Sequence, residues 1–305
     1  MVETIDFGNV HWYHVIDPSE KDYNYLLDEF EFHPLDIEDC RSVNQRPKID
    51  EYDDYYFLIL HFPYFDKSNQ FVRIREVKIF WGKDYIVTIG KAHWVVKKLF
   101  KEMQEKQGNG TLDTETLAAS SDSLLYNILD RLMVETFTLI SRIGGSVDAL
   151  NYDIFTMRTQ KVLEQMSITR KNLIALNTTF RPQLRVFHKF ESGGIKGYTE
   201  DMEGYWGDIL DQYQKMFDMV EDYGELIEGL SQTFDSLQTN KTNEIIKILT
   251  ILSTIMLPLT VISSIYGMNV PLPFQNNVWS FLGIAVLMMI VVIIFLLYFR
   301  KKHWL

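Results

Sequence analysis

The tripeptide Gly267-Met268-Asn269 follows a long apolar segment and carries groups that could handle a hydrated cation. A divalent ion such as Mg²⁺ gives up its octahedral water shell reluctantly. Several copies of the Asn269 amide oxygen around one axis could hydrogen-bond that shell and admit the ion without dehydrating it first. Gly267 would let the backbone come close, and Met268 would pack beneath as support. Taken alone, the tripeptide also fits a glycine helix stop followed by a turn asparagine.

A second set of polar side chains near the N-terminus comprises His33, Asp36, Glu38, Asp39 and Cys40. The set has no second cysteine and no paired histidines, which disfavours a closed zinc site. Glu38 and Asp39 could instead offer hard oxygen ligands to Mg²⁺ or Ca²⁺. His11 and His14 could face one metal, but the favoured interpretation is that they flank a strand or turn on the surface.

Acidic residues also gather later in the chain, with eleven Asp or Glu and one Lys between residues 200 and 240. Copies of such a helix in an oligomer would repel one another. Residues 156–190 carry seven Lys or Arg and one Glu, so pairing between the two helices would supply counter-charge. Bound divalent ions are a second source of compensation, and a solvated acidic face is the alternative.

Two apolar segments must position these groups. Residues 278–299 contain no charge over 22 residues, and at ~1.5 Å per residue they extend about 33 Å, enough to cross a bilayer. Residues 245–265 are apolar but interspersed with Thr and Ser hydroxyls. Hydroxyl groups need partners in lipid, so this helix is expected to face other helices or water on one side.

Charge predicts the orientation of the two spans. Arg300, Lys301 and Lys302 follow the second span directly, whereas residues 267–277 carry no charge. The basic end therefore belongs on the cytoplasmic side. The chain is then expected to cross the cell membrane twice, with both termini in the cytoplasm.

The N-terminus shows no signal-peptide pattern. One cysteine in 305 residues excludes an intrachain disulfide framework, and the formal charge of −11 disfavours nucleic acid as a partner.

A helical stripe connects the acidic region to the first span. Apolar residues recur every three or four positions from Met202 to Leu237, a spacing typical of coiled coils. If the helix continues to Tyr266 it is about 95 Å long. One such helix cannot enclose a pore, so the stripe predicts a homo-oligomer with this face on the symmetry axis.

The candidate pore-lining residues continue the same spacing into the first span. Asn243 and Thr260 would form polar rings, while Leu249 and Leu257 would form dry constrictions that close by dewetting. For Thr260, a hydroxyl bond between helices is the alternative. The full set is Asn243, Ile246, Leu249, Ser253, Leu257, Thr260 and Ser264.

The remaining chain predicts a mixed soluble domain. Strands are expected at residues 55–62, 71–81 and 85–89, and Ser19 with Asp22 predicts the capped start of a helix that reaches Phe30. Helices are expected over residues 120–190, with breaks near Gly144-Gly145 and at Pro182, after a linker at 108–110. Phosphate-binding glycine loops, Gly-x-Ser-x-Gly and His-Glu-x-x-His are absent from the sequence, so an enzyme is not expected.

Several motifs together resemble the CorA family of divalent-cation channels. Besides Gly267-Met268-Asn269, they match in order and position and span nearly the whole chain: His33-Pro34-Leu35 with Glu38-Asp39, Asn44 to Lys48, Asn240 to Glu244, Pro258-Leu259-Thr260, and Lys302 to Leu305. The resemblance implies a homopentameric funnel: an α+β cytoplasmic domain (1–115), a helical region (116–200), a stalk helix (201–266) whose residues 245–266 form the first span, an outer loop (267–277), a second span (278–299) and a basic tail (300–305).

The resemblance also implies Mg²⁺ uptake, with Co²⁺ or Ni²⁺ permeation. It further implies that intracellular Mg²⁺ holds the channel closed by bridging Asp39 of one protomer to Asp208 of its neighbour, aided by Glu38 and Asp211.

One departure leaves the transported ion open. Many family members follow the tripeptide with a loop that contains an acid, but residues 270–277 of this chain contain none. Zn²⁺ transport of the ZntB kind is therefore an alternative. A membrane-tethered sensor that does not conduct is another, although it would not need polar residues in its first span, and a secondary transporter would usually show more spans and internal repeats.

Overall fold

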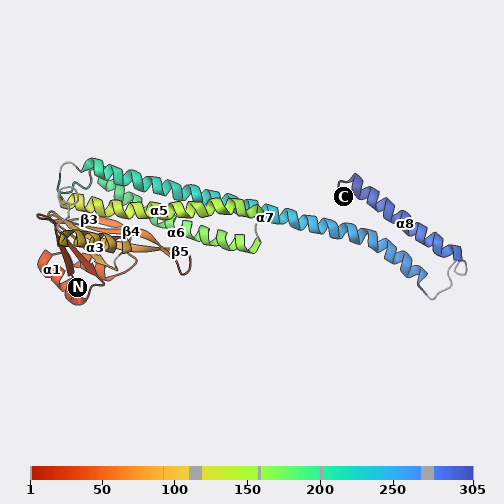
Figure 1. Cartoon of the computed structure of the whole chain (residues 1–305), viewed down its shortest axis with the longest axis horizontal. Helices are drawn as coiled ribbons and strands as arrows, with labels where there is room; N and C mark the ends of the chain where they lie inside the picture. The colour runs from red at the N-terminus through yellow and green to blue at the C-terminus, as the bar shows by residue number, and fades with distance from the viewer. Residues whose placement is uncertain are drawn as a thin grey trace. The chain divides into compact units, whose positions relative to one another are not determined.

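The computed structural model describes residues 2–91, 93–109, 119–156, 159–199, 202–268 and 278–304 (Figure 1). The chain divides into two compact units, Met1–Leu230 and Ser231–Leu305. The described elements of the sheet domain are β1 (Val2–Asp6), β2 (His11–Ile16), α1 (Glu20–Phe30), α2 (Pro34–Arg41), β3 (Lys48–Glu51), β4 (Tyr55–Asp66), β5 (Phe71–Gly82), β6 (Tyr85–Gly90) and α3 (Trp94–Gly108). The long helices are α5 (Ser121–Thr156), α6 (Thr159–Glu191), α7 (Glu203–Tyr266) and α8 (Val278–Lys301).

The six strands form one mixed sheet in the order β1-β2-β6-β5-β4-β3. Only β2 and β6 are parallel among the paired strands described, and the other neighbours are antiparallel. The three predicted strands are confirmed as β4, β5 and β6, and β4 and β5 form a hairpin whose register runs from Tyr55–Gly82 to Asp66–Phe71. The predicted cap of α1 is also confirmed, because Asp22 accepts a hydrogen bond from the Ser19 backbone at 2.8 Å.

Helices cover both faces of the sheet because its strands are apolar on both sides. On one face, Phe57, Phe80 and Val87 pack in a buried cluster with side chains of α1 and α2. Phe32 and Phe80 belong to this cluster, and their stacked rings have centroids 3.9 Å apart. On the other face, Trp12 meets Phe100 of α3 edge to face, with ring centroids 5.0 Å apart, and α5 and α6 pack on β4 and β5.

The helical region is more continuous than the sequence predicts. The expected break at Gly144-Gly145 is wrong, because α5 runs through both glycines. A Cβ atom at Gly144 would overlap the ring of Tyr223, so this glycine permits a close helix contact rather than a turn. The expected break at Pro182 is also wrong, since α6 continues through it. The predicted linker begins where α3 ends at Gly108, and residues 110–118 lie outside the described part.

The apolar stripe on the first part of α7 is buried within the chain itself. Tyr213 is 1% exposed and packs on Phe180 and Phe187 of α6, with ring centroids 4.7 and 4.5 Å away. Trp206 is 2% exposed and lies 5.0 Å from the ring of Phe190. The prediction that this stretch faces a symmetry axis is therefore wrong, because the chain's own helices and sheet already cover it.

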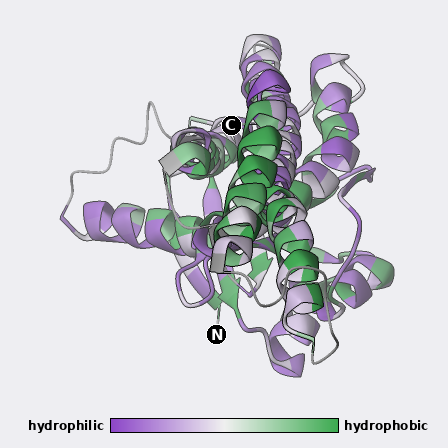
Figure 2. Cartoon of the chain, turned by 90° about the vertical axis from the view of Figure 1, so that its right-hand side faces the viewer, coloured by the Kyte–Doolittle hydropathy of each residue, from purple (hydrophilic) through white to green (hydrophobic). Residues whose placement is uncertain are grey.

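The second unit contains the end of α7 and all of α8, and both are apolar over membrane length. The two helices that contain candidate membrane spans have mean hydropathies of 2.2 and 3.1 over their most apolar windows, which are 6% and 0% buried. Figure 2 shows α8 and the C-terminal part of α7 mostly in the green of hydrophobic residues. Such exposure of apolar helices excludes the core of a soluble domain and fits two membrane spans.

Candidate ion pathway and regulatory acids

The α7 helix ends at the predicted filter. Its last residue is Tyr266, and the Gly267 backbone N–H still donates to the Ser263 carbonyl at 3.0 Å. The N–H of Met268 donates to the Ile265 carbonyl at 3.3 Å. A Cβ at position 267 would lie 3.2 Å from the Ser263 carbonyl oxygen, so glycine eases this tight helix end. Met268 is 54% exposed in the single chain, and Asn269 lies outside the described residues.

The predicted pore-lining residues share one exposed face of α7. Leu249 and Leu257 are 55% and 66% exposed in the single chain. The residues classed as exposed are Asn243, Ile246, Leu249, Ser253, Leu257, Thr260 and Ser264. The side chains that are half-buried in the same stretch are Lys247, Ile251, Thr254, Ile255, Pro258, Leu259 and Ile262. At about 100° per residue, the two sets lie roughly half a turn apart.

The side chains of α8 that are buried or half-buried form a single stripe along that helix. Its buried and half-buried side chains recur every three or four residues and comprise Ser280, Ile284, Met288, Val291, Val292, Phe295 and Phe299. Within this unit Lys247 of α7 donates to the His303 carbonyl after α8, at 3.3 Å. One helix therefore covers one side of the first span, and the side with the predicted pore residues is left uncovered by the described chain.

The Thr260 hydroxyl is already engaged within its own helix. It donates to the Met256 carbonyl at 2.8 Å, so the alternative of a hydroxyl bond between helices does not occur within the described chain. This bond uses the hydroxyl hydrogen and leaves the oxygen as an acceptor on the exposed face. An acceptor that faces away from α8 is suited to water molecules around a cation.

The candidate ligands Glu38 and Asp39 lie on the short helix α2, which is fixed at its start. The His33 side chain accepts from the Leu35 N–H at 3.2 Å. Asp36 is 1% exposed and accepts from the hydroxyls of Tyr52 and Tyr55 at 3.1 and 2.9 Å. Burial raises the pKa of the Asp36 carboxyl, and the two tyrosine hydrogen bonds only partly oppose the shift.

Glu38 is exposed, whereas Asp39 is partly covered and already has a cationic partner. The Lys48 ammonium lies 2.8 Å from the Asp39 carboxylate and also contacts Asp50. Burial lowers the pKa of Lys48, but its bonds to Asp39 and Asp50 outweigh that effect and hold the pKa above its ordinary value. A divalent ion at Asp39 would therefore compete with a permanently charged lysine.

The acids on α7 have a different setting. Asp208 is exposed, and its Oδ2 atom accepts from the Tyr126 hydroxyl at 2.9 Å and from the Gln212 amide at 2.7 Å. The same amide lies 3.3 Å from Asp130 on α5. Both bonds go to the same carboxylate oxygen of Asp208. Asp211 is exposed.

The structure does not join the acids of α2 and α7 into one site within a single chain. No group of three or more His, Cys, Asp or Glu side chains among the described residues is arranged to hold a metal. The sequence does not indicate that Lys48 is the partner of Asp39, or that Tyr126, Gln212 and Asp130 lie near Asp208. Tyr126 and Asp208 are 82 residues apart in the chain, and no sequence spacing signals such a contact.

The predicted charge pairing between α6 and α7 is confirmed at two places. Arg170 lies 2.8 Å from Glu228, and Arg181 lies 2.7 Å from Glu221.

His11 and His14 do not form a metal pair: His11 contacts Asp6 at 2.6 Å, whereas His14 is 2% exposed and contacts the Thr88 hydroxyl at 2.7 Å. The expectation of a surface position is therefore wrong for His14.

Comparison with known protein families identifies the family to which this chain belongs. The sequence profile of the family described as "CorA-like Mg2+ transporter protein" matches residues 8–301. The chain belongs to the CorA family. It is 28% identical to the cobalt/magnesium transport protein CorA of Thermotoga maritima, covering 90% of this chain and 78% of that protein. It is 30% identical to the metal ion transporter candidate YfjQ of Bacillus subtilis, covering 99% and 93%.

Solved structures of a CorA transporter and of a ZntB domain are similar to this fold. The complete structure of the CorA magnesium transporter from Methanocaldococcus jannaschii superposes with a TM-score of 0.82 at 22% identity, covering 97% of this chain and 92% of that one. The cytoplasmic domain of ZntB from Vibrio parahaemolyticus gives a TM-score of 0.64 at 14% identity, covering 79% and 100%. The CorA fold, a soluble domain followed by a long helix and a C-terminal apolar helix, is thus present over nearly the full chain.

Proposed function

We propose that this CorA protein is a homopentameric channel that takes up Mg²⁺ and also passes Co²⁺ or Ni²⁺. Relatives named for cobalt and magnesium transport support the choice of Mg²⁺ and Co²⁺. The observation that carries the proposal is the exposed face of α7, which bears the predicted pore residues opposite the face that is half-buried. A face that combines apolar and hydroxyl side chains is unfavourable toward lipid alone and is suited to an axis shared by several copies.

In this channel the Gly267-Met268-Asn269 tripeptide forms the selectivity filter. The amide of Asn269 contacts the water shell of the ion, since a neutral oxygen need not displace the waters that Mg²⁺ holds. Below it, Ser264, Thr260 and Ser253 offer hydroxyl oxygens. Leu257, Leu249 and Ile246 narrow the path with apolar walls, and Asn243 supplies the last polar ring. The proposed orientation has both termini in the cytoplasm, and the basic end of α8 supports it.

Intracellular Mg²⁺ closes the channel by bridging Asp39 of one protomer to Asp208 of its neighbour. Glu38 and Asp211, both exposed, contribute further oxygens. Two close carboxylates repel by roughly 4 kcal/mol at 4 Å and an effective dielectric near 20 before screening. Loss of the bridging ion at several interfaces would therefore favour the open state.

Zinc transport of the ZntB kind is the second candidate. Residues 270–277 contain no acid, so attraction of cations at the outer mouth would rest on amide and backbone dipoles. The same feature is compatible with Mg²⁺, because the filter handles a hydrated ion.

Flux into liposomes separates the candidates. Purified protein is reconstituted, and uptake of Mg²⁺, Co²⁺, Ni²⁺ and Zn²⁺ is measured individually and in competition. We expect Mg²⁺ uptake above that of empty liposomes, with competition by Co²⁺ and Ni²⁺. Uptake of Zn²⁺ without Mg²⁺ would favour the second candidate. In the same liposomes, Asp39→Ala combined with Asp208→Ala should remove inhibition by internal Mg²⁺ but retain flux, with Asp28→Ala as a matched surface control.

A further inference from the structure

A cleft of about 400 Å³ opens between the sheet and α5, apart from the acids and the pore residues. It is lined by Pro63, Tyr64, Phe65, Lys67, Trp94, Glu135, Thr138, Leu139 and Arg142. These residues come from the end of β4, the turn after it, the first residue of α3 and one stretch of α5. The volume falls in the range of small-molecule sites, roughly 300–1,000 Å³.

The cleft contains two cationic side chains, Arg142 and Lys67, whose charges are not balanced by an ion pair among the described residues. The Arg142 guanidinium instead lies over the ring of Phe65, 5.8 Å from its centroid. An aromatic face orients a cation but does not neutralise it. In a chain of formal charge −11, this is a local positive site that favours an anion.

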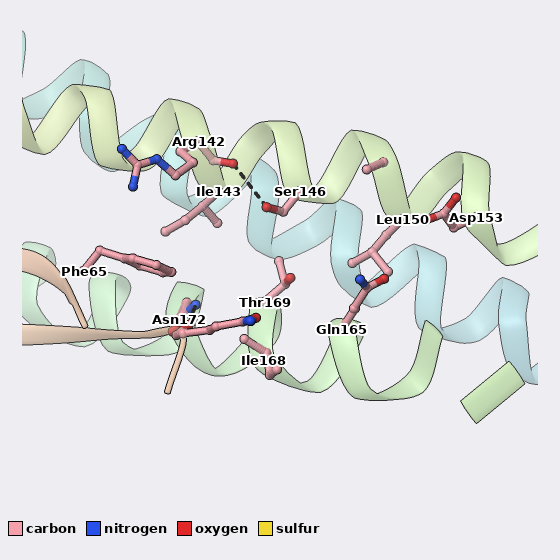
Figure 3. Close-up of a pocket in the computed structure, with 12 residues that line it drawn as sticks. Phe65, Arg142, Ile143, Ser146, Leu150, Asp153, Gln165, Ile168, Thr169 and Asn172 are labelled. Carbon is pink, nitrogen blue, oxygen red and sulfur yellow. Dashed lines mark hydrogen bonds between the residues drawn. The ribbon is translucent and has the colours of Figure 1, made fainter. Parts of the chain in front are cut away.

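The direction of the arginine side chain strengthens this point. Arg142 also borders a second cavity of about 210 Å³ between α5 and α6, whose far end carries Asp153. Figure 3 shows the Arg142 guanidinium extended toward the Phe65 end and away from Asp153. That acid therefore does not compensate the guanidinium, which remains available at the boundary between the two cavities.

The cleft is also lined by aromatic side chains and by one acid, Glu135. Trp94 is 45% exposed although it is a large apolar side chain, and Tyr64 and Phe65 line the same cleft. Exposed indole surface beside cations is suited to stacking with a flat, electron-poor or neutral heterocycle. Glu135 is half-buried and has no hydrogen bond or ion pair among the described residues, so its carboxylate can accept hydrogen bonds from hydroxyls of a ligand.

We propose that this cleft binds a nucleotide. The base stacks on Trp94, the ribose hydroxyls donate to Glu135, and the phosphates contact Arg142 and Lys67. A volume of about 400 Å³ fits a single nucleotide, and the acidic total charge of the chain disfavours a nucleic-acid strand. The proposal stands on the sheet domain and α5, and does not depend on the ion that the channel carries.

Binding to the full-length protein in detergent tests the site. Equilibrium dialysis with ATP, ADP and inorganic phosphate is carried out in chelator without divalent ions, so that the regulatory acids and Mg²⁺–nucleotide complexes do not contribute. We expect saturable binding of ATP and ADP, and at least tenfold weaker binding of inorganic phosphate. Arg142→Gln and Trp94→Leu should each weaken ATP binding about tenfold, as expected for the loss of a charged hydrogen bond or a stacking contact.

A matched control and a second measurement keep the outcome interpretable. Arg185→Gln changes an exposed arginine of α6 outside the cleft and should leave ATP binding unchanged. The thermal unfolding midpoint of each variant identifies those that fail to fold, and Glu135→Gln, which preserves size, then serves as a third probe. Absence of saturable nucleotide binding, binding of phosphate as tight as that of ATP, or wild-type binding in Arg142→Gln and Trp94→Leu would each overturn the proposal. Because no flux is measured, such a failure leaves the channel proposal unaffected.

Discussion

Replacement of Lys48 by methionine is expected to tighten the binding of regulatory Mg²⁺. The Lys48 ammonium lies 2.8 Å from the Asp39 carboxylate, and the metal in the proposed site needs the same oxygens. Lys48→Met removes the competing charge but keeps the length of the chain that lies over Phe57, where the ammonium is 5.3 Å from the ring centroid. The carboxylates of Asp39 and Asp50 then lose their cation and attract Mg²⁺ more strongly.

The magnitude follows from the exposure of the pair. Two unit charges about 3 Å apart at an effective dielectric near 20 attract by about 5 kcal/mol. The side chains of Lys48 and Asp39 are 32% and 23% exposed, so desolvation, screening and side-chain entropy offset most of this attraction. A net competition of about 1–2 kcal/mol remains, equivalent to a factor of roughly 5–30 in Mg²⁺ affinity.

Protection from protease across a Mg²⁺ titration provides the assay. The midpoint for Lys48→Met should fall to a lower Mg²⁺ concentration by that factor. Lys48→Arg keeps the positive charge and should stay near wild type, as should Lys21→Met, which changes an exposed lysine of α1. A midpoint for Lys48→Met that is unchanged, or that moves to higher Mg²⁺, would refute the competition between Lys48 and the metal.

Three further outcomes are expected. Asn269→Ala should reduce Mg²⁺ uptake in liposomes to the level of empty vesicles with assembly intact on gel filtration, and wild-type flux would reject the filter assignment. Leu249→Ser or Leu257→Ser should raise closed-state leak in planar bilayers, because polar walls hydrate the constriction; unchanged leak in both would remove them as the gate. Burial lowers the pKa of His14 to about 4, only partly opposed by its bond to Thr88, so the contribution of His14 to stability is present above pH 6.5 and lost by up to about 3 kcal/mol toward pH 4. His14→Asn should flatten the acid side of the unfolding profile measured by thermal denaturation, and an equally steep profile would contradict the buried-histidine account.

The features that could be predicted from the sequence depend on residues that are close together in the chain. The capped start of α1 at Ser19 and the strands β4 to β6 follow from nearby side chains. The helix α7 continues without interruption through Gly224 and Gly229, because contacts along its length outweigh the low helix propensity of glycine. The charges of α6 and α7 predicted their pairing because each helix has a strong bias of one sign.

The features that the sequence did not predict depend on distant contacts. Gly144 was expected to break a helix, but it provides room for Tyr223. The stripe around Tyr213 has coiled-coil spacing, yet the same spacing serves packing against Phe180 within one chain. Periodicity identifies an apolar face without identifying its partner. Lys48 at the start of β3 meets Asp39 of α2 only in the folded domain, and linear spacing does not encode that approach.

Cysteine modification along the first span tests most directly whether the exposed face of α7 lines the cation path. The native Cys40 is 5% exposed and does not compete for a thiol reagent. Leu257→Cys and Thr260→Cys lie on the exposed face, and Ile255→Cys and Ile262→Cys lie on the half-buried face. Each variant is reconstituted, treated with a charged methanethiosulfonate and assayed for Mg²⁺ uptake. The account predicts that modification blocks uptake at positions 257 and 260 and leaves it intact at 255 and 262, whereas block at 255 and 262 without block at 257 and 260 would contradict it.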